Sequence, residues 1–360
     1  MSALKKYRDV RLDLYRCLAV SNVLAIHFFL YIGFYEEPLS SPLMFLQLLL
    51  RTFFTICVPS FLLLTGYLMS KKNLSSHYYQ GISHTLLTYL VVSLFCKLFK
   101  ILFYGETFSA PLFLKGLLSF SEAPYSWYIE MYIGLYLLIP FLNAGYQALS
   151  SRTAKKCLLI TLIVLTVLPG TINDFNLHLL PDYWELLWPF TYYFAGAYLR
   201  EFLPTISYKK IFPLIVVLPI LFSAFDFSLN YEKPYRSGYY NGYFGIITFI
   251  LTVLCFVGIM NLKLESLANP IRIFIHKVSE LSLGIYLSSW IIDSWIYHQS
   301  FILDIATPLR IKYFVPVVFI VFMGSFCISA LSELIVQLIF QLYSLLRTRI
   351  STFVTKSTVK

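Results

Sequence analysis

Two ionisable residues, Arg16 and His27, interrupt the first long apolar segment of the chain, which runs from about residue 14 to residue 34. A charged or titratable side chain inside a membrane-spanning segment costs several kcal/mol, so such residues are functional candidates. The eleven residues that separate them would rise about 16 Å on an α-helix over almost a whole number of turns, which puts both side chains on nearly the same face. Arg11 and Asp13 precede the apolar segment. The spacing therefore predicts a polar track from a cationic mouth to a histidine near mid-membrane.

A neutral imidazole beside a water-filled cavity suits general-base chemistry, because the ordinary pKa of an imidazole lies near the working pH. The alternative is that Arg16 extends to the membrane interface and that His27 is a packing residue with a satisfied ring. The sequence holds no Walker-type phosphate loop, no dinucleotide-binding glycine pattern and no zinc-protease histidine motif. It also lacks a serine or cysteine nucleophile in a recognisable elbow.

Hydrophobic residues make up 58% of the 360 residues and charged residues 13%, about half the charged fraction of a soluble domain. The composition predicts an integral membrane protein of the all-α class, since helices satisfy their own backbone hydrogen bonds in lipid. The formal net charge of +10 does not indicate nucleic-acid binding, because most lysines and arginines fall in alternate loops. The six cysteines lie singly in apolar segments, so we expect neither a disulfide framework nor a metal site.

Hydropathy predicts about ten transmembrane helices, each long enough to cross about 30 Å of hydrocarbon with some tilt. We expect the first helix to be retained, because its polar residues interrupt the apolar core that a cleavable signal peptide needs. Residues 1–345 are expected to form a single transmembrane domain, followed by a basic cytoplasmic tail at 346–360. The predicted helices are 14–34, 45–69, 82–104, 126–148, 157–172, 184–201, 211–227, 243–261, 279–299 and 313–345.

The distribution of positive charge supports this count and predicts that both termini are cytoplasmic. With the N-terminus inside, nineteen Lys and Arg residues fall in inner segments and five in outer loops, as the positive-inside rule requires. A missed or extra helix would scramble the alternation in every loop that follows it. The five residues of the outer loops are Lys115, Lys233, Arg236, Arg310 and Lys312.

Other polar residues also lie inside predicted helices. Arg51 precedes a stretch with Pro59 and Gly66, which would bend or thin the helix and open room beside a neighbour. Glu130 follows Trp127 near the outer face.

Two lysines and two carboxylates complete this set. Lys97 and Lys100 are one turn apart, so they could pair with a carboxylate, or Lys100 could extend outward to the interface. A structural partner inside the bundle is the favoured interpretation for Glu333, whereas Asp293 is equally open to a structural and a functional role.

Several segments resemble membrane-bound acyltransferase family 3, the integral membrane O-acyltransferases of surface glycans. The first is R-L-D-L-Y-R followed by ten residues and a histidine, which is the stretch from Arg16 to His27. Each short motif alone is weak, but five in the family's order on a ten-helix frame are far more specific. The other four are V-P-S-F-L-L-L-T-G-Y-L at 58–68, S-W-Y-I-E-M-Y-I-G-L-Y-L-L-I-P at 126–140, F-A-G-A-Y-L at 194–199 and L-S-L-G-I-Y-L at 281–287.

The resemblance implies transfer of an acyl group, usually acetyl, from cytoplasmic acyl-CoA to a hydroxyl of a cell-surface or lipid-linked glycan. Acyl-CoA would be a co-substrate, and no bound cofactor is expected. Arg16 and His27 match the family's proposed functional pair. Arg11 and Arg16, oriented by Asp13, would bind the CoA phosphates, because a guanidinium holds phosphate bidentately. His27 would take the proton of the acceptor hydroxyl.

Arg51 and Glu130 are weaker candidates, which would line the acceptor side. The expected partners are acyl-CoA, membrane lipid and a glycan or lipid-linked sugar, with no nucleic acid, and the expected location is the bacterial plasma membrane. A polysaccharide transporter or flippase would use the same polar track without chemistry. A sensor or assembly partner is a third hypothesis.

Two positions depart from the family's pattern. Many members carry R-x-x-R at the start of the third helix, whereas residues 81–84 read Gly-Ile-Ser-His. Many also carry a histidine after I-Y-L in the ninth helix, where this chain has Ser288, Ser289 and Trp290. The first departure concerns donor binding and the second concerns the acceptor side.

Overall fold

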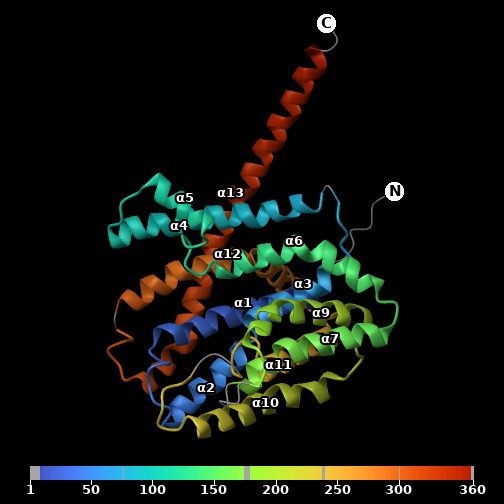
Figure 1. The fold of residues 1–360 in the computed structure, drawn as a ribbon. Coiled ribbons are helices and arrows are strands. Elements are labelled where there is room, and N and C mark those ends of the chain that lie inside the picture. The colour runs from blue at the N-terminus through green and yellow to red at the C-terminus, as the bar shows by residue number, and fades with distance from the viewer. Residues whose placement is uncertain (1–8, 76, 174–178, 237–239, 300, 358–360) are drawn as a thin grey trace.

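The protein is a bundle of α-helices from which the C-terminal helix projects (Figure 1). The computed structural model describes residues 9–357, apart from 76, 174–178, 237–239 and 300, and of residues 347–357 it describes the backbone. Named strands are absent from this part of the chain, so the all-α class is confirmed. Residues 1–8 and 358–360, which hold part of the charge used to orient the chain, lie outside the described residues.

Helices follow one another with short connections. In chain order they are α1 (Val10–Tyr31), α2 (Pro42–Phe54), α3 (Cys57–Met69), η1 (Tyr79–Ile82), α4 (Ser83–Tyr104), α5 (Ala110–Leu118), α6 (Trp127–Ala148), α7 (Arg152–Thr166), α8 (Pro169–Ile172), η3 (Asp182–Leu187), α9 (Trp188–Phe202), α10 (Tyr208–Leu229), α11 (Ile246–Met260), α12 (Asn269–His298), η4 (Thr307–Tyr313) and α13 (Phe314–Ser357).

Helical structure occupies each of the ten segments predicted from hydropathy. Within the described ranges, seven helical stretches are long and apolar enough to cross a membrane. The other three predicted segments fall on α9, α11 and α12. Helices α9 and α11 have 15 residues each, which is about 22 Å of rise. The seven stretches are Val10–Tyr31, Pro42–Met69, Tyr79–Tyr104, Trp127–Ala148, Arg152–Ile172, Tyr208–Leu229 and Thr307–Leu346.

Helix α1 packs against α2, α3, α11, α12 and α13 and lies in the interior of the bundle (Figure 1). Its start is capped by Asp9, whose carboxylate accepts a hydrogen bond from the Arg11 amide at 3.0 Å. At its end Gly33 takes the left-handed conformation with φ +72°, as helix terminators commonly do. The Arg310 guanidinium donates to the Ile32 carbonyl at 2.6 Å, so each end of the helix has a hydrogen bond from outside the helical ladder.

The predicted helix 45–69 is broken into α2 and α3, with the break at residues 55 and 56. Pro59 has no N–H to donate to the Thr55 carbonyl, and its ring would clash with that carbonyl in a continuous helix. The Thr55 hydroxyl turns back and donates to the Arg51 carbonyl at 2.8 Å. The bend expected from Pro59 is therefore confirmed.

Glycines let α3 and α9 approach until their backbones touch. A Cβ on Gly66 would overlap the Tyr193 carbonyl, and a Cβ on Gly196 would overlap the Leu63 carbonyl. Small residues allow this kind of close helix contact in membranes. The room that Gly66 was expected to open beside a neighbouring helix is therefore filled by α9.

Helix α13 has 44 residues and crosses the bundle before its C-terminal turns extend beyond it (Figure 1). The predicted boundary between domain and tail at residue 345 has no helix break, since α13 continues to Ser357.

We expect Gly196→Ala to lower the thermal stability of the detergent-solubilised protein, because the added methyl group overlaps the Leu63 carbonyl and overpacking costs about 1–3 kcal/mol. Gly145→Ala is the matched control, since a Cβ there has no atom within 4 Å. The measurement is the melting temperature by fluorescence-detected size exclusion. Equal melting temperatures for the two variants would contradict the close α3–α9 contact.

Candidate functional site

The first half of the site lies where α1 meets the start of α12. The Ser279 hydroxyl donates to Oδ1 of Asp13 at 2.6 Å, and Nη1 of Arg16 donates to the Ser279 oxygen at 3.3 Å. Nδ1 of His276 lies 3.4 Å from Oδ2 of Asp13. Asp13 is buried and Arg16 is half-buried. The structure thus brings together two of the three residues predicted for the donor side.

Arg11, the third of them, has different partners. Its guanidinium forms an ion pair with Asp9 at 2.7 Å and donates to the Met260 carbonyl of α11 at 2.8 Å. The hydrogen bond from Arg11 lowers the pKa of the Asp9 carboxyl. Arg11 and Arg16 are five residues apart on α1, which turns them about 140° from each other. They therefore lie on different sides of the helix.

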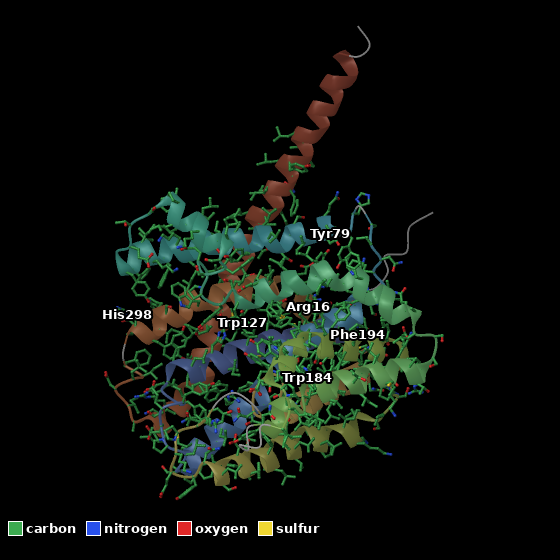
Figure 2. All side chains as sticks on the ribbon, in the orientation of Figure 1. Arg16, Tyr79, Trp127, Trp184, Phe194 and His298 are labelled. Atoms are coloured by element: carbon green, nitrogen blue, oxygen red, sulfur yellow. The ribbon has the colours of Figure 1, made fainter. Side chains whose placement is uncertain are left out.

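A cavity of about 170 Å³ begins at Arg16. Figure 2 shows Arg16 on α1 within the bundle, and the cavity extends from there between five helices. Most of its wall is apolar or aromatic, and Arg16 is its charged residue. The lining residues are Arg16 and Val23 of α1, Val58, Phe61 and Thr65 of α3, Thr85 of α4, Tyr128, Ile129 and Tyr132 of α6, and Ser282, Leu283 and Tyr286 of α12.

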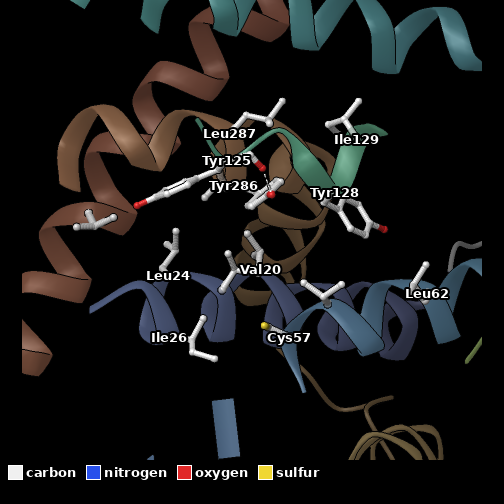
Figure 3. Packing of buried hydrophobic residues seen from close by; sticks show 14 of the residues in the cluster. Val20, Leu24, Ile26, Cys57, Leu62, Tyr125, Tyr128, Ile129, Tyr286 and Leu287 are labelled. Carbon is white, nitrogen blue, oxygen red and sulfur yellow. Dashed lines mark hydrogen bonds between the residues drawn. The ribbon is translucent and has the colours of Figure 1, made fainter. Parts of the chain in front are cut away.

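His27 lies further along α1, beyond the tyrosines of this cavity. Its ring centroid is 4.0 Å from that of Tyr125 and 6.4 Å from that of Tyr286. The Tyr286 hydroxyl donates to the Tyr125 carbonyl, and Figure 3 shows both rings in the layer that faces Val20 and Leu24 of α1. Tyr286 also lines the cavity, whereas His27 and Tyr125 are not among its lining residues.

His27 faces a buried carboxylate of α12. Nδ1 of His27 lies 3.7 Å from Oδ2 of Asp293, and both side chains are buried. The Tyr125 hydroxyl donates to the same oxygen at 3.0 Å. The Tyr31 and Tyr125 hydroxyls are 2.7 Å apart, so Tyr31 is the donor to Tyr125. Asp293, His27 and the two phenols form a cluster that we call the His27–Asp293 cluster.

Sequence reasoning marked Asp293 as an intramembrane carboxylate without finding its partner, and it missed Tyr31 and Tyr125. The signal for Asp293 was its charge in an apolar helix. The tyrosines gave none, because interfacial anchoring explains most tyrosines in such a chain.

The two residues predicted for the acceptor side lie in different surroundings. Arg51 is buried, donates to the Asn241 carbonyl at 2.6 Å and lies over the Tyr235 ring at 4.7 Å. Glu130 is exposed on α6, and its carboxylate has no hydrogen bond or ion pair with the described residues. Asp226 joins the Arg51 network through Asn241, whose amide donates to Oδ2 of Asp226 at 3.5 Å.

Lys97 and Lys100 both pair with carboxylates, which is one of the two alternatives that the sequence left open. Lys97 Nζ lies 2.7 Å from Glu106, and Lys100 Nζ lies 3.5 Å from Glu122. The Glu333 carboxylate has a partner on another helix, since it lies 3.0 Å from Nε2 of His84, but the His84 ring is exposed rather than inside the bundle.

At the positions that depart from the family pattern, the side chains contact neighbouring helices. His84 pairs with α13 through Glu333. Ser288 donates to the Ser325 carbonyl of α13 at 3.2 Å, and Ser289 donates to the Tyr286 carbonyl at 2.8 Å. Both serines are buried, and of the two only Ser288 bonds a neighbouring helix, because Ser289 bonds the preceding turn of α12.

Comparison with known proteins gives one match. The model of a family described as an acyltransferase domain, the third of that name, matches residues 9–333. Neither the curated proteins nor the solved structures include a match. The matched range contains Asp13, Arg16, His27 and Asp293.

Proposed function

Because the chain belongs to acyltransferase family 3, we propose that it is a membrane O-acyltransferase that moves an acyl group from cytoplasmic acyl-CoA to a hydroxyl of a cell-surface or lipid-linked glycan. Acetyl is the acyl group we propose. The observation that carries this proposal is that one interior helix, α1, bears both Arg16, which lines the cavity, and His27, which lies beside the cavity-lining residue Tyr286. The family membership supports acyl transfer, and this geometry supports the roles proposed below.

Arg16 is the proposed anchor of the CoA phosphates. A guanidinium presents a planar fork that matches phosphate oxygens, and its charge does not titrate. Asp13 holds Ser279, and Ser279 in turn accepts a hydrogen bond from Arg16, which orients the fork. Arg11 is the second proposed CoA-binding residue, but it lies on another side of α1, where a CoA phosphate would have to replace the Asp9 carboxylate.

His27 is the proposed general base. The acceptor oxygen attacks the thioester carbon while its proton passes to the imidazole. The carbon–sulfur bond then breaks, and the leaving CoA thiolate takes that proton from His27 and departs as the thiol. Atoms and charge balance without a further reactant. An imidazole is suited to this exchange because it gains and loses a proton near neutral pH.

Arg51 and Glu130 are proposed to line the acceptor half, with Arg51 held by Tyr235 and Asn241. Glu130 is free to meet a sugar hydroxyl, since its exposed carboxylate has no partner among the described residues.

The proposed setting is the bacterial plasma membrane, with ten helices crossing it and both termini in the cytoplasm. The alternating positive charge of the loops supports this orientation. Helices α9, α11 and α12 would complete the count beyond the seven long apolar stretches.

A reporter that is active only outside the cell should stay silent when fused after Lys360, because an even number of crossings returns the chain to the cytoplasm. The same reporter inserted after Tyr231, between α10 and α11, should be active. Reporter activity is read in intact cells at matched expression. Activity of the C-terminal fusion would refute the ten-helix orientation.

Arg16→Lys should weaken acetyl-CoA binding about tenfold or more although it keeps the charge, because lysine cannot form the bidentate contact, and charge-assisted hydrogen bonds contribute about 1.5–3 kcal/mol. Arg152→Lys is the control, since Arg152 is exposed on α7 and bonds Tyr198. Binding of labelled acetyl-CoA to the purified protein is the measurement. If Arg16→Lys and Arg16→Ala both bind with wild-type affinity, the donor role of Arg16 is wrong.

His27→Ala and His27→Gln should both abolish acyl transfer and leave acetyl-CoA bound. General-base assistance contributes about a hundred- to ten-thousand-fold, and glutamine retains hydrogen bonding without accepting a proton. His77→Gln is the control, because the His77 ring is exposed and contacts Gln80. The assays are acetyl-CoA thioester cleavage by the purified protein and acylation of the surface glycan in cells at matched membrane levels. Near-normal acylation by His27→Gln would favour a transporter.

A further inference from the structure

We propose that Asp293 is a positioning residue for the acyl transfer: its buried carboxylate holds His27 with Nδ1 inward, so that Nε2 is the nitrogen offered to the acceptor hydroxyl. The inference rests on the proposed function and adds to it the residue that sets the orientation and tautomer of the base.

The first observation is the pairing itself. Asp293 is 1% exposed, and its Oδ2 is the carboxylate atom nearest to Nδ1 of His27, at 3.7 Å. Nδ1 is buried and has no hydrogen bond to any described residue. Nε2 is separated from Nδ1 by one ring carbon and is not the nitrogen that forms the contact with Asp293. Catalytic hydrogen bonds are often long before substrate binds and tighten in the reacting complex.

The second observation is what surrounds the carboxylate. Within the described part of the chain, no lysine or arginine forms an ion pair with Asp293, and its bonded partner is the Tyr125 phenol. Burial of a carboxylate without a cation is costly. A packing role alone does not require that cost, whereas an acid that faces a histidine gains when the ring becomes protonated during proton transfer.

The third argument concerns the tautomer of His27 that a contact with a carboxylate favours. A neutral imidazole carries its proton on one nitrogen, and the partner of that nitrogen decides which one. A carboxylate accepts hydrogen bonds, so it favours the proton on Nδ1 and leaves the lone pair on Nε2. Tyr125 supports the arrangement, because its hydroxyl holds Oδ2 while Tyr31 donates to Tyr125.

Asp293→Asn should lower kcat roughly a hundredfold while the KM for acetyl-CoA stays near the wild-type value, because the charge-assisted hydrogen bond expected in the reacting complex cannot form and the amide can stabilise the other tautomer. Asp293→Glu should recover part of the rate, since it restores a carboxylate. The full-length protein is assayed in phospholipid vesicles by thioester cleavage of acetyl-CoA.

Glu122→Gln is the matched control. Glu122 is also a buried carboxylate, and it pairs with Lys100 rather than with a residue of the His27–Asp293 cluster. It should change kcat much less than Asp293→Asn does. A wild-type kcat in Asp293→Asn, or equal losses in both variants, would overturn the positioning role.

A second readout does not depend on acyl transfer. Diethyl pyrocarbonate acylates an unprotonated imidazole nitrogen, and peptide mass spectrometry reports the modification of His27 alone. Modification should be several times slower in Asp293→Asn than in the wild type, and unchanged in Glu122→Gln. If the wild-type protein does not cleave acetyl-CoA but this difference is present, the proposed function fails and the positioning stands. Equal rates in all three proteins would refute the positioning.

Tyr125→Phe covers the case in which Asp293→Asn does not fold. It leaves the carboxylate and removes the phenol that supports Oδ2, so kcat should fall by less than about tenfold, the effect of one neutral hydrogen bond. A loss as complete as that of His27→Gln would show that the phenol controls His27 and would contradict the assignment to Asp293.

Discussion

The contact between α1 and α12 is the constraint on which the rest of the structure depends. Asp13 meets Ser279 at one end of this contact, and His27 meets Asp293 at the other. Fourteen residues separate the two positions on each helix, which is about 21 Å and nearly four turns. The helices are therefore parallel and in matching register. A shift of one helix by a single turn would leave two carboxylates buried without partners, and the cost of that fixes the register.

Other elements of the bundle pack around the contact between α1 and α12. Helix α3 closes the cavity beside Arg16, and α9 packs on α3 through their glycines. The segment before α6 places Tyr125 over His27, and α13 supports α12 from behind through Ser325 and Ser329. The cavity and the His27–Asp293 cluster thus belong to one interior layer built on α1.

The sequence was sufficient for the helical class, for the position of nearly every helix and for the shared face of Arg16 and His27. The eleven-residue spacing predicted that face, and both side chains do turn toward α12. Periodicity could not supply the partners. Asp293 is 266 residues from His27, and nothing local in either segment points to the other. Arg11 shows the same limit, because its charge suggested a place beside Arg16 while its angle on the helix directs it to α11.

Burial alone does not separate functional from structural polar residues in this bundle. Arg51 is as deeply buried as His27, but its guanidinium is held by a carbonyl and by tyrosine rings, a stable arrangement for a desolvated cation. His27 differs in its neighbour rather than in its bonding, since Nε of Arg51 is also buried without a hydrogen bond to the described residues. Nδ1 of His27 lies 3.7 Å from a carboxylate, and an imidazole can gain and lose a proton near neutral pH whereas a guanidinium cannot, so the histidine is the stronger sign of chemistry.

The placement of the cavity and of His27 bears on the choice between enzyme and transporter. Arg16 and Tyr286 line the cavity, and His27, which is not among the lining residues, lies 6.4 Å from Tyr286 between ring centroids. A transporter needs one continuous path that a whole sugar can follow, whereas an acyltransferase needs only the acyl carbon and the hydroxyl to meet. Two polar sites at successive positions along α1, one at Arg16 and one at His27, fit two substrates that meet better than one substrate that passes through, in agreement with the match to the acyltransferase family.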